Sequence, residues 1–226
     1  MMIHSTAPVS AVPKAFRQGM IAFTAEQIAG LGYVVVLVDG PGTPLRSHAF
    51  EFRSYGRIES CGGLDDHVAA IKALAAERPW MDVSSGVAIT GQSGGGYATV
   101  RAMATFPDFY TVGISLCGNH DQAAYLALWG DTFQGPHSEQ LYAGQANHTV
   151  AANITGRLFL IHGEMDDNVH PAHTLKVVDA LIAADKDFDL LIVPNATHAV
   201  GWHPYVQRRS WDFLLQHHPL AGADGR

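Results

Sequence analysis

The stretch VAITGQSGGGYATV, residues 87–100, constrains the fold of this chain more than any other segment. An apolar run that suits a buried strand leads through Gly91 to Ser93, and three glycines at 94–96 open a run of small residues that suits a helix. A G-x-S-x-G pattern between a strand and a helix predicts a sharp turn that strains the serine backbone and lifts its hydroxyl above the sheet. Glycine suits the flanking positions because larger side chains would collide with the neighbouring strand and helix.

Short β-branched runs alternate with helical patterns along the rest of the chain, which indicates a parallel sheet covered by helices on both faces. We expect strands at 33–39, 86–90, 112–116, 157–162 and 188–194. Helices are expected near 14–30, 64–75, 95–106, 175–182 and 203–217. With 226 residues, 47% of them apolar, and no internal repeat or low-complexity linker, the chain is predicted to form one α/β domain over residues 1–226.

Composition and charge argue against several kinds of partner. The longest uncharged apolar run, 32–38, is far shorter than the ~20 residues of a membrane span, and residues 1–10 lack the pattern of a signal peptide. A cytoplasmic protein with no membrane partner is therefore expected. The net charge of −7 without a basic cluster argues against nucleic acid. The two cysteines, Cys61 and Cys117, are expected to be buried thiols.

A serine hydroxyl becomes a useful nucleophile only beside an imidazole base that a carboxylate orients. In the fold that carries this serine turn, the chain order is serine, then acid, then histidine. HGEMDDNVHP, after the fourth expected strand, contains Asp166 and Asp167, and PNATHAVGWH, after the fifth, contains His198. Because parallel strands end at one sheet edge, all three loops should meet near Ser93. Either aspartate can be the acid, since Asp167 can instead cap the helix expected near Pro171.

No metal and no cofactor are expected. His170 and His173 lie near the loop that contains Asp166 and Asp167, but their spacing differs from the i, i+4 histidine pair of a helical zinc site. No third ligand suggests itself in the sequence.

Six stretches together resemble the catalytic α/β-hydrolase domain of the prolyl oligopeptidase and dipeptidyl peptidase family of serine peptidases. They are GYVVVLVDGPGTP, SYGRIESCGGLDDHVAAIKAL, GQSGGGYAT, LCGNHD, LIHGEMDDNVHP and NATHAV. The resemblance covers roughly residues 7–216 and implies that Ser93 is the nucleophile, His198 the base and Asp166 the orienting acid. It also places Asn168 where it can contact substrate near the scissile bond.

The segment from about 119 to 152 is polar and glycine-bearing, with scattered aromatic residues. A long insertion after a strand commonly builds a substrate wall, although surface helices with aromatic undersides fit this composition equally well. By analogy with the aromatic residues that line the family's pocket, Tyr125 and Trp129 are candidates for the wall of an acyl pocket.

The chain departs from the family pattern in two ways. Family members have a large β-propeller ahead of the hydrolase domain, and none is seen here. The family's sheet has eight strands in the order 1-2-4-3-5-6-7-8, of which the five expected here correspond to the fourth through the eighth. We hypothesise that residues 1–5 form a short third strand and that a second copy of the chain covers the exposed edge of residues 33–38, which predicts a homo-oligomer.

The same departure affects the oxyanion hole. The backbone N–H of Gly94 is the expected first donor, at the start of a helix where free N–H groups favour negative charge. The family's second donor is a tyrosine hydroxyl just after the third strand, and Ser5 stands there in this chain. Esterases of this fold use a backbone N–H from that loop, so Ser5 or Thr6 is the expected second donor.

These features predict a serine hydrolase that transfers an acyl group to water. Without a gating propeller the pocket is expected to be open. This favours a carboxylesterase acting on small esters, because activated esters demand less transition-state stabilisation than amides. The alternative is an aminopeptidase or dipeptidyl peptidase acting on short peptides. A third possibility is a non-catalytic remnant that serves as a binding module.

Overall fold

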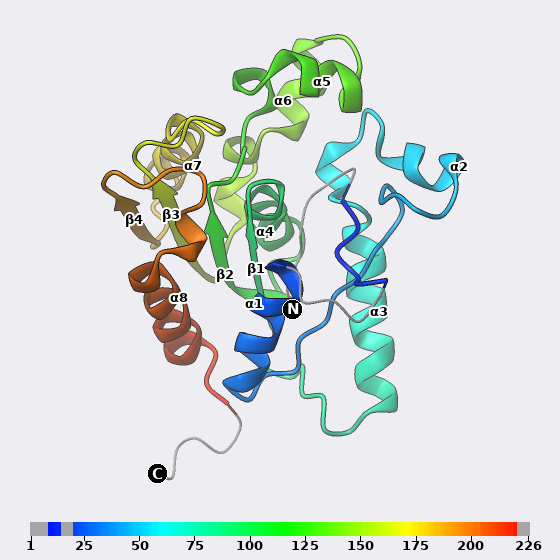
Figure 1. Cartoon of the computed structure of the whole chain (residues 1–226), viewed down its shortest axis with the longest axis vertical. Helices are drawn as coiled ribbons and strands as arrows, with labels where there is room; N and C mark the ends of the chain where they lie inside the picture. Colours follow the sequence, from blue (N-terminus) through cyan, green and yellow to red (C-terminus); the bar gives the residue numbers. More distant parts are fainter. Residues whose placement is uncertain (1–8, 15–19, 221–226) are drawn as a thin grey trace.

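Four parallel strands form the centre of the molecule (Figure 1). The structure is a computed structural model that describes residues 9–14 and 20–220. The strands are β1 (Val87–Gln92), β2 (Tyr110–Leu116), β3 (Arg157–Gly163) and β4 (Asp189–Val193), which lie in the sheet in chain order. Every neighbouring pair is parallel. The predicted parallel α/β architecture is confirmed, together with four of the five predicted strands.

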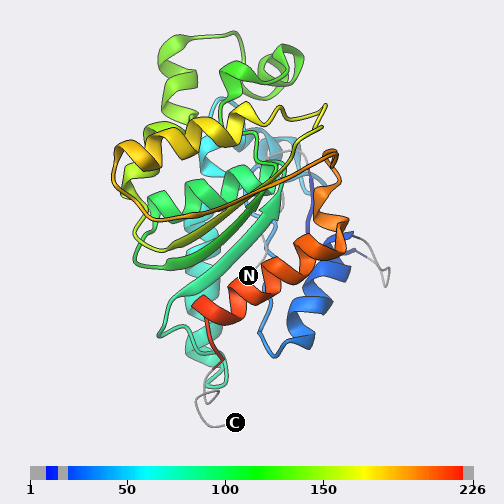
Figure 2. The same cartoon turned by 90° about the vertical axis from the view of Figure 1, so that its left-hand side faces the viewer.

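Helices pack on both faces of this sheet (Figure 2). On one face, α3 (Leu64–Glu77), α4 (Gly94–Thr105) and α7 (Ala172–Ala183) share an apolar core with Leu158 and Leu160 of β3. On the other face, α1 (Met20–Gly30) and α8 (Pro204–His217) share a second core with Phe159 and Ile161. The alternate residues of one strand therefore pack into two cores, which explains why residues 158–161 of β3 are all apolar.

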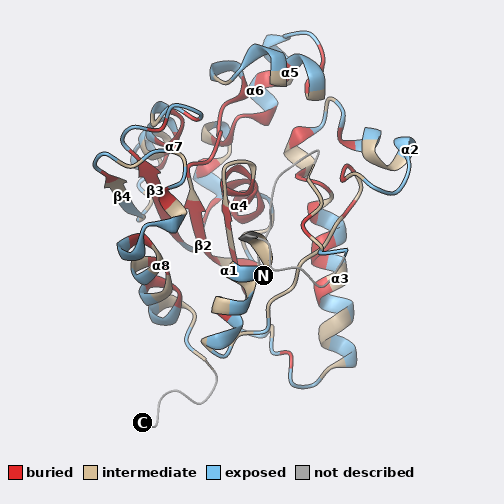
Figure 3. Ribbon diagram, in the orientation of Figure 1, coloured by how far each residue is buried: buried red, intermediate tan, exposed pale blue. Residues whose placement is uncertain are grey.

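The remaining elements are short. They are α2 (His48–Glu51), α5 (Ala127–Gln134), α6 (Glu139–Gln145) and the 3₁₀ turns Phe52–Ser54, Ile58–Ser60, Gln122–Ala124, Asn147–Thr149, Ala151–Asn153 and Val200–Trp202. Burial is deepest in β2, β3 and α4 (Figure 3), whereas β4 is mostly exposed or half-buried. None of the helices in the described part of the chain combines the length and apolar character of a membrane span.

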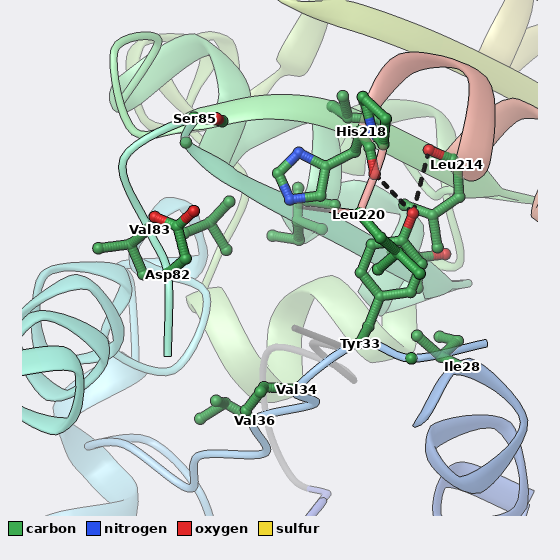
Figure 4. A pocket seen from close by; sticks show the side chains of 18 of the residues that line it. Ile28, Tyr33, Val34, Val36, Asp82, Val83, Ser85, Leu214, His218 and Leu220 are labelled. Atoms are coloured by element: carbon green, nitrogen blue, oxygen red, sulfur yellow. Dashed lines mark hydrogen bonds between the residues drawn. The ribbon is translucent and has the colours of Figure 1, made fainter. Parts of the chain in front are cut away.

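The prediction of a strand at 33–39 is wrong, because this segment has no regular secondary structure and joins no sheet in the described part of the chain. A cavity of about 400 Å³ lies between Val34 and Val36 of this segment and residues 87–90 of β1 (Figure 4). A hydrogen-bonded ladder needs strands about 4.8 Å apart, so high β-propensity alone cannot make a strand here. In the family's strand order, the third strand lies at this place, between the fourth strand and the fifth. The hypothesised third strand, residues 1–5, lies outside the described residues.

Candidate active site

Ser93 lies at the sharp turn between β1 and α4, with φ 60° and ψ −121°. A positive φ is strained for any residue other than glycine. The turn is held on both sides: the Ser93 N–H donates to Leu116 O of β2 at 2.8 Å, and its carbonyl accepts from Tyr97 N of α4 at 3.0 Å. The serine backbone therefore has the strained conformation that the glycine pattern predicts.

Close packing of α4 against the end of β2 explains one of the three glycines. A Cβ on Gly96 would lie 2.6 Å from Leu116 O and 2.9 Å from Gly118 Cα. Both are backbone atoms, so no side-chain rotation relieves the overlap. The glycine lets the helix begin against the sheet edge, where its first N–H groups and its dipole favour a negatively charged oxygen near Gly94.

The predicted acid and the predicted base meet at neighbouring strand ends. Nδ1 of His198, in the loop after β4, lies 2.7 Å from Oδ2 of Asp166, in the loop after β3. The Asp166 side chain is fully buried, whereas 22% of the His198 side chain is exposed. Asp167, by contrast, is exposed, and of the two aspartates it is Asp166 that contacts His198.

The Asp166 carboxylate is stabilised in its charged form. Its Oδ1 accepts the backbone N–H groups of Asn168 at 3.0 Å and Val169 at 2.9 Å. Burial would raise the pKa of Asp166, but the hydrogen bond from His198 and those from Val169 and Asn168 outweigh burial and lower this pKa. The group is therefore ionised at neutral pH and can accept a hydrogen bond from the Nδ1–H of His198.

Two hydrogen bonds, one between backbone groups and one from a side chain, join the turn at Ser93 and the loops after β3 and β4. Met165 N donates to Ala196 O at 2.9 Å. This bond joins the loop after β3, which contains Asp166 and is called the acid loop, to the loop after β4, which contains His198 and is called the histidine loop. The Gln92 side chain, next to Ser93, donates through Nε2 to His198 O at 2.6 Å. No hydrogen bond joins the Ser93 hydroxyl to the His198 ring within residues 9–14 and 20–220, and such bonds are often long in ligand-free sites.

The candidate substrate residues gather beside the acid loop. Tyr125 donates its hydroxyl to Asn168 Oδ1 at 2.7 Å, and its ring meets Trp129 edge to face at 5.7 Å. Burial raises the pKa of Tyr125, so its hydroxyl stays protonated and can donate. The 119–152 insertion thus brings two aromatic rings to the same sheet edge as Asp166. The other candidates, Ser5 and Thr6, lie outside the described residues.

Sequence reasoning missed Gln92, because the position before the serine in G-x-S-x-G accepts any residue. It also missed the polar groups behind the acid: ligand atoms of Cys117, His162 and Asp166 lie within 4.8 Å of one another. They do not fit a metal ion, since Val169 O and Thr174 Oγ1 already contact the two ring nitrogens of His162. Burial also raises the pKa of the Cys117 thiol, which keeps it protonated and a poor ligand.

The two histidines considered as metal ligands have other contacts. His170 Nδ1 accepts from Ala172 N at 3.1 Å, and His173 Nδ1 accepts from Asp121 N at 3.3 Å. Their ring nitrogens therefore stabilise the backbone of the loop and of the 119–152 insertion.

Comparisons with known proteins agree with this architecture. Dipeptidyl peptidase 8 of Mus musculus is 32% identical in an alignment 216 residues long that covers 88% of this chain and 23% of the relative. A probable dipeptidyl-aminopeptidase B of Ajellomyces capsulatus (strain H88) is 30% identical, over 90% of this chain and 22% of the relative. The chain thus spans less than a quarter of the length of these curated relatives.

Solved structures share the fold. Dipeptidyl peptidase 4 of Porphyromonas gingivalis aligns with a TM-score of 0.82 and 25% identity, over 96% of this chain and 31% of that chain. A putative dipeptidyl aminopeptidase IV of Bacteroides ovatus ATCC 8483 gives 0.86 at 23% identity, with the same coverage. These alignments confirm the predicted α/β-hydrolase fold. The sequence profile of the prolyl oligopeptidase family matches residues 20–219, and the chain belongs to this family.

Proposed function

We propose that this chain is a serine peptidase that cleaves short peptides, with Ser93 as nucleophile, His198 as base and Asp166 as the acid that orients the base. The observation that carries the proposal is the 2.7 Å contact between His198 Nδ1 and the buried Asp166 carboxylate. This contact keeps the proton on Nδ1 and leaves Nε2 available to accept a proton. The strained Ser93 turn at the same sheet edge supplies the hydroxyl.

In the proposed reaction, Ser93 Oγ attacks the scissile carbonyl while His198 Nε2 removes the hydroxyl proton. His198 then gives this proton to the leaving amine, and water releases the acyl group by the reverse steps. The Gly94 N–H, at the start of α4, donates to the oxyanion that forms in both steps. Ser5 or Thr6 remains the predicted second donor.

The proposed substrate is a peptide that loses a dipeptide from its amino terminus, as the names of the relatives suggest. Tyr125 and Trp129 form an aromatic wall for the residue before the scissile bond. Asn168, which Tyr125 holds through its Oδ1, can donate its amide N–H to a substrate carbonyl. We therefore propose peptide cleavage rather than ester hydrolysis, the function that sequence analysis ranked first, because the curated relatives are named as peptidases.

One pair of measurements tests the proposal. A fluorophosphonate probe should label the folded chain at Ser93 but not Ser93→Ala, whereas Ser84→Ala, which removes an exposed serine, should label normally. Gly-Pro and Ala-Pro p-nitroanilides should be cleaved. Fast hydrolysis of p-nitrophenyl acetate or butyrate with negligible anilide cleavage would make the chain an esterase. Folded protein without a Ser93 adduct would make it a binding module.

Two further expectations stay predictions. A second copy of the chain covering residues 33–38 would give a dimer or larger assembly in light scattering, and a strictly monomeric protein would contradict it. A cytoplasmic location agrees with two free, buried cysteines, and fractionation of the source cells would test it.

A further inference from the structure

A second histidine lies behind the acid, in a place that the proposed triad does not use. His162 is the penultimate residue of β3 and is fully buried. Its Nε2 lies 2.8 Å from Val169 O and 3.3 Å from Asp166 Oδ2, and its Nδ1 lies 2.7 Å from Thr174 Oγ1. Both nitrogens therefore contact groups that shape the acid loop.

These contacts determine where the proton is. A carbonyl oxygen and a carboxylate oxygen can only accept, so Nε2 of His162 must be protonated. The Thr174 hydroxyl can then donate to Nδ1, which leaves the ring neutral. Burial lowers the pKa of His162 more strongly than Val169 and the Asp166 charge raise it, which agrees with a neutral ring at neutral pH.

The Nε2–H of His162 acts on Asp166 by two routes. Directly, it approaches Oδ2, the same oxygen that accepts from His198. Indirectly, it holds the carbonyl of Val169, whose N–H donates to Oδ1 of the same carboxylate at 2.9 Å. One buried donor thus constrains both oxygens of the group that orients the base.

We propose that His162 is a positioning residue, whose Nε2–H, shared between Val169 O and Asp166 Oδ2, fixes the carboxylate against His198. The proposal rests on the proposed function, because it assigns His162 a role through the triad acid. It makes no use of the ring as an acid or a base, since the ring stays neutral throughout.

Removal of this donor should shift the pH dependence of catalysis, which loss of a purely structural contact would not do. Without the donor, the negative charge of Asp166 is less shared and acts more fully on His198. The acid limb of the kcat/KM pH profile, which reports the protonation of the base, should then move to higher pH. A less rigid carboxylate should also lower kcat more than it changes KM.

The test compares His162→Leu, which removes the contacts of Nε2–H with Val169 O and Asp166 Oδ2, with His162→Gln, whose side-chain amide retains a donor. For His162→Leu we expect kcat to fall about 10- to 100-fold and the acid limb to rise by roughly half a pH unit. His162→Gln should recover most of both changes. The matched control is His120→Gln, which removes another fully buried histidine whose nitrogens contact Asn147 and Ser115.

A readout independent of turnover separates this proposal from the proposed function. The downfield proton NMR signal of His198 Nδ1–H should shift in His162→Leu and stay unchanged in His120→Gln. If wild-type protein shows this signal but neither labels nor cleaves, the proposed function fails while the role of His162 is still measured. Folded His162→Leu with the wild-type signal and acid limb would overturn the proposal.

If His162→Leu does not fold, Thr174→Val decides the question. This nearly isosteric change removes only the hydroxyl at His162 Nδ1 and touches neither Asp166 nor His198 in the contacts described above. Loss of the donor to Nδ1 weakens the polarisation of Nε2–H, so the NMR signal and the acid limb should move in the same direction by a smaller amount. Unchanged values in folded Thr174→Val would then overturn the proposal.

Discussion

Substitution of Gly96 by alanine tests whether the packing of α4 on the sheet edge determines the position of Ser93. Gly96 is the third residue of α4 and is buried, and its added Cβ would lie 2.6 Å from Leu116 O. An ordinary van der Waals contact begins at 3.4 Å, so helix and strand must separate by about 0.8 Å at this point. The same strand end accepts the Ser93 N–H, so the displacement reaches the serine.

Two opposing effects set the size of the change. Alanine in a helix interior is favoured over glycine by about 0.5–1 kcal/mol, whereas overpacking of a close-packed contact costs about 1–3 kcal/mol. The overlap involves backbone atoms that cannot rotate away, so we expect the cost to win and unfolding free energy to fall by about 1–2 kcal/mol. A shift of the serine approaching 1 Å should slow its reaction about 100-fold.

Gly144→Ala is the matched control. Gly144 is exposed in α6, and a Cβ there would meet nothing within 4 Å. The helix preference then acts alone, so this variant should gain up to about 1 kcal/mol and keep wild-type labelling. Urea unfolding followed by tryptophan fluorescence gives the stabilities, and the rate of fluorophosphonate labelling reports Ser93. A Gly96→Ala protein as stable and as reactive as Gly144→Ala would refute the packing argument.

Three further predictions concern the acid, the histidine loop and pH. Asp166→Asn should fold and lose about 10³- to 10⁴-fold in kcat because an amide favours the wrong His198 tautomer, whereas Asp167→Asn should cleave the anilide substrates at a near wild-type rate. Gly163→Ala, whose Cβ would lie 2.4 Å from the Ala196 carbonyl oxygen, should displace the loop that contains His198. The labelling rate should then fall by more, expressed as a free energy, than the free energy of unfolding in urea. Stability should fall between about pH 6.5 and pH 5, because burial lowers the pKa of several histidines in the folded chain and the unfolded chain therefore binds protons first. Each contributes up to about 1.4 kcal/mol per pH unit, and urea midpoints that are unchanged over this range would contradict the prediction. The histidines are His120, His162 and His173.

The sequence predicts the sheet and its helices well where a periodic pattern of apolar residues packs against a neighbouring element. The helix predicted near 64–75 is α3, in which Leu64, Val68 and Ile71 recur at helical spacing and are buried. The loops that contain Asp166 and His198 were predicted to meet because parallel strands end at one edge, and their side chains lie 2.7 Å apart. Such inferences need only the strand order and the direction of the chain.

Prediction fails where the outcome depends on a partner that the local sequence does not specify. Residues 33–39 have strong β-propensity, yet the cavity beside β1 leaves them without a ladder in the described structure. The contact of His162 with Asp166 joins a strand end to an irregular loop, so no periodicity indicates it. The bond from Gln92 to the His198 carbonyl depends in the same way on where a loop 106 residues away returns.

The rigidity of the candidate site follows from a sheet ladder that continues one residue past β1, β2 and β3. Ser93 N donates to Leu116 O at 2.8 Å, Cys117 N to Ile161 O at 2.9 Å, and Glu164 N to Val193 O at 2.9 Å. The sheet therefore fixes the backbone up to Ser93, the proposed nucleophile, and up to the second residue before Asp166, the proposed acid. Since backbone bonds alone do this, the chemistry depends on the few side chains beyond the ladder, which is why substitutions there should change rate and pH dependence more than stability.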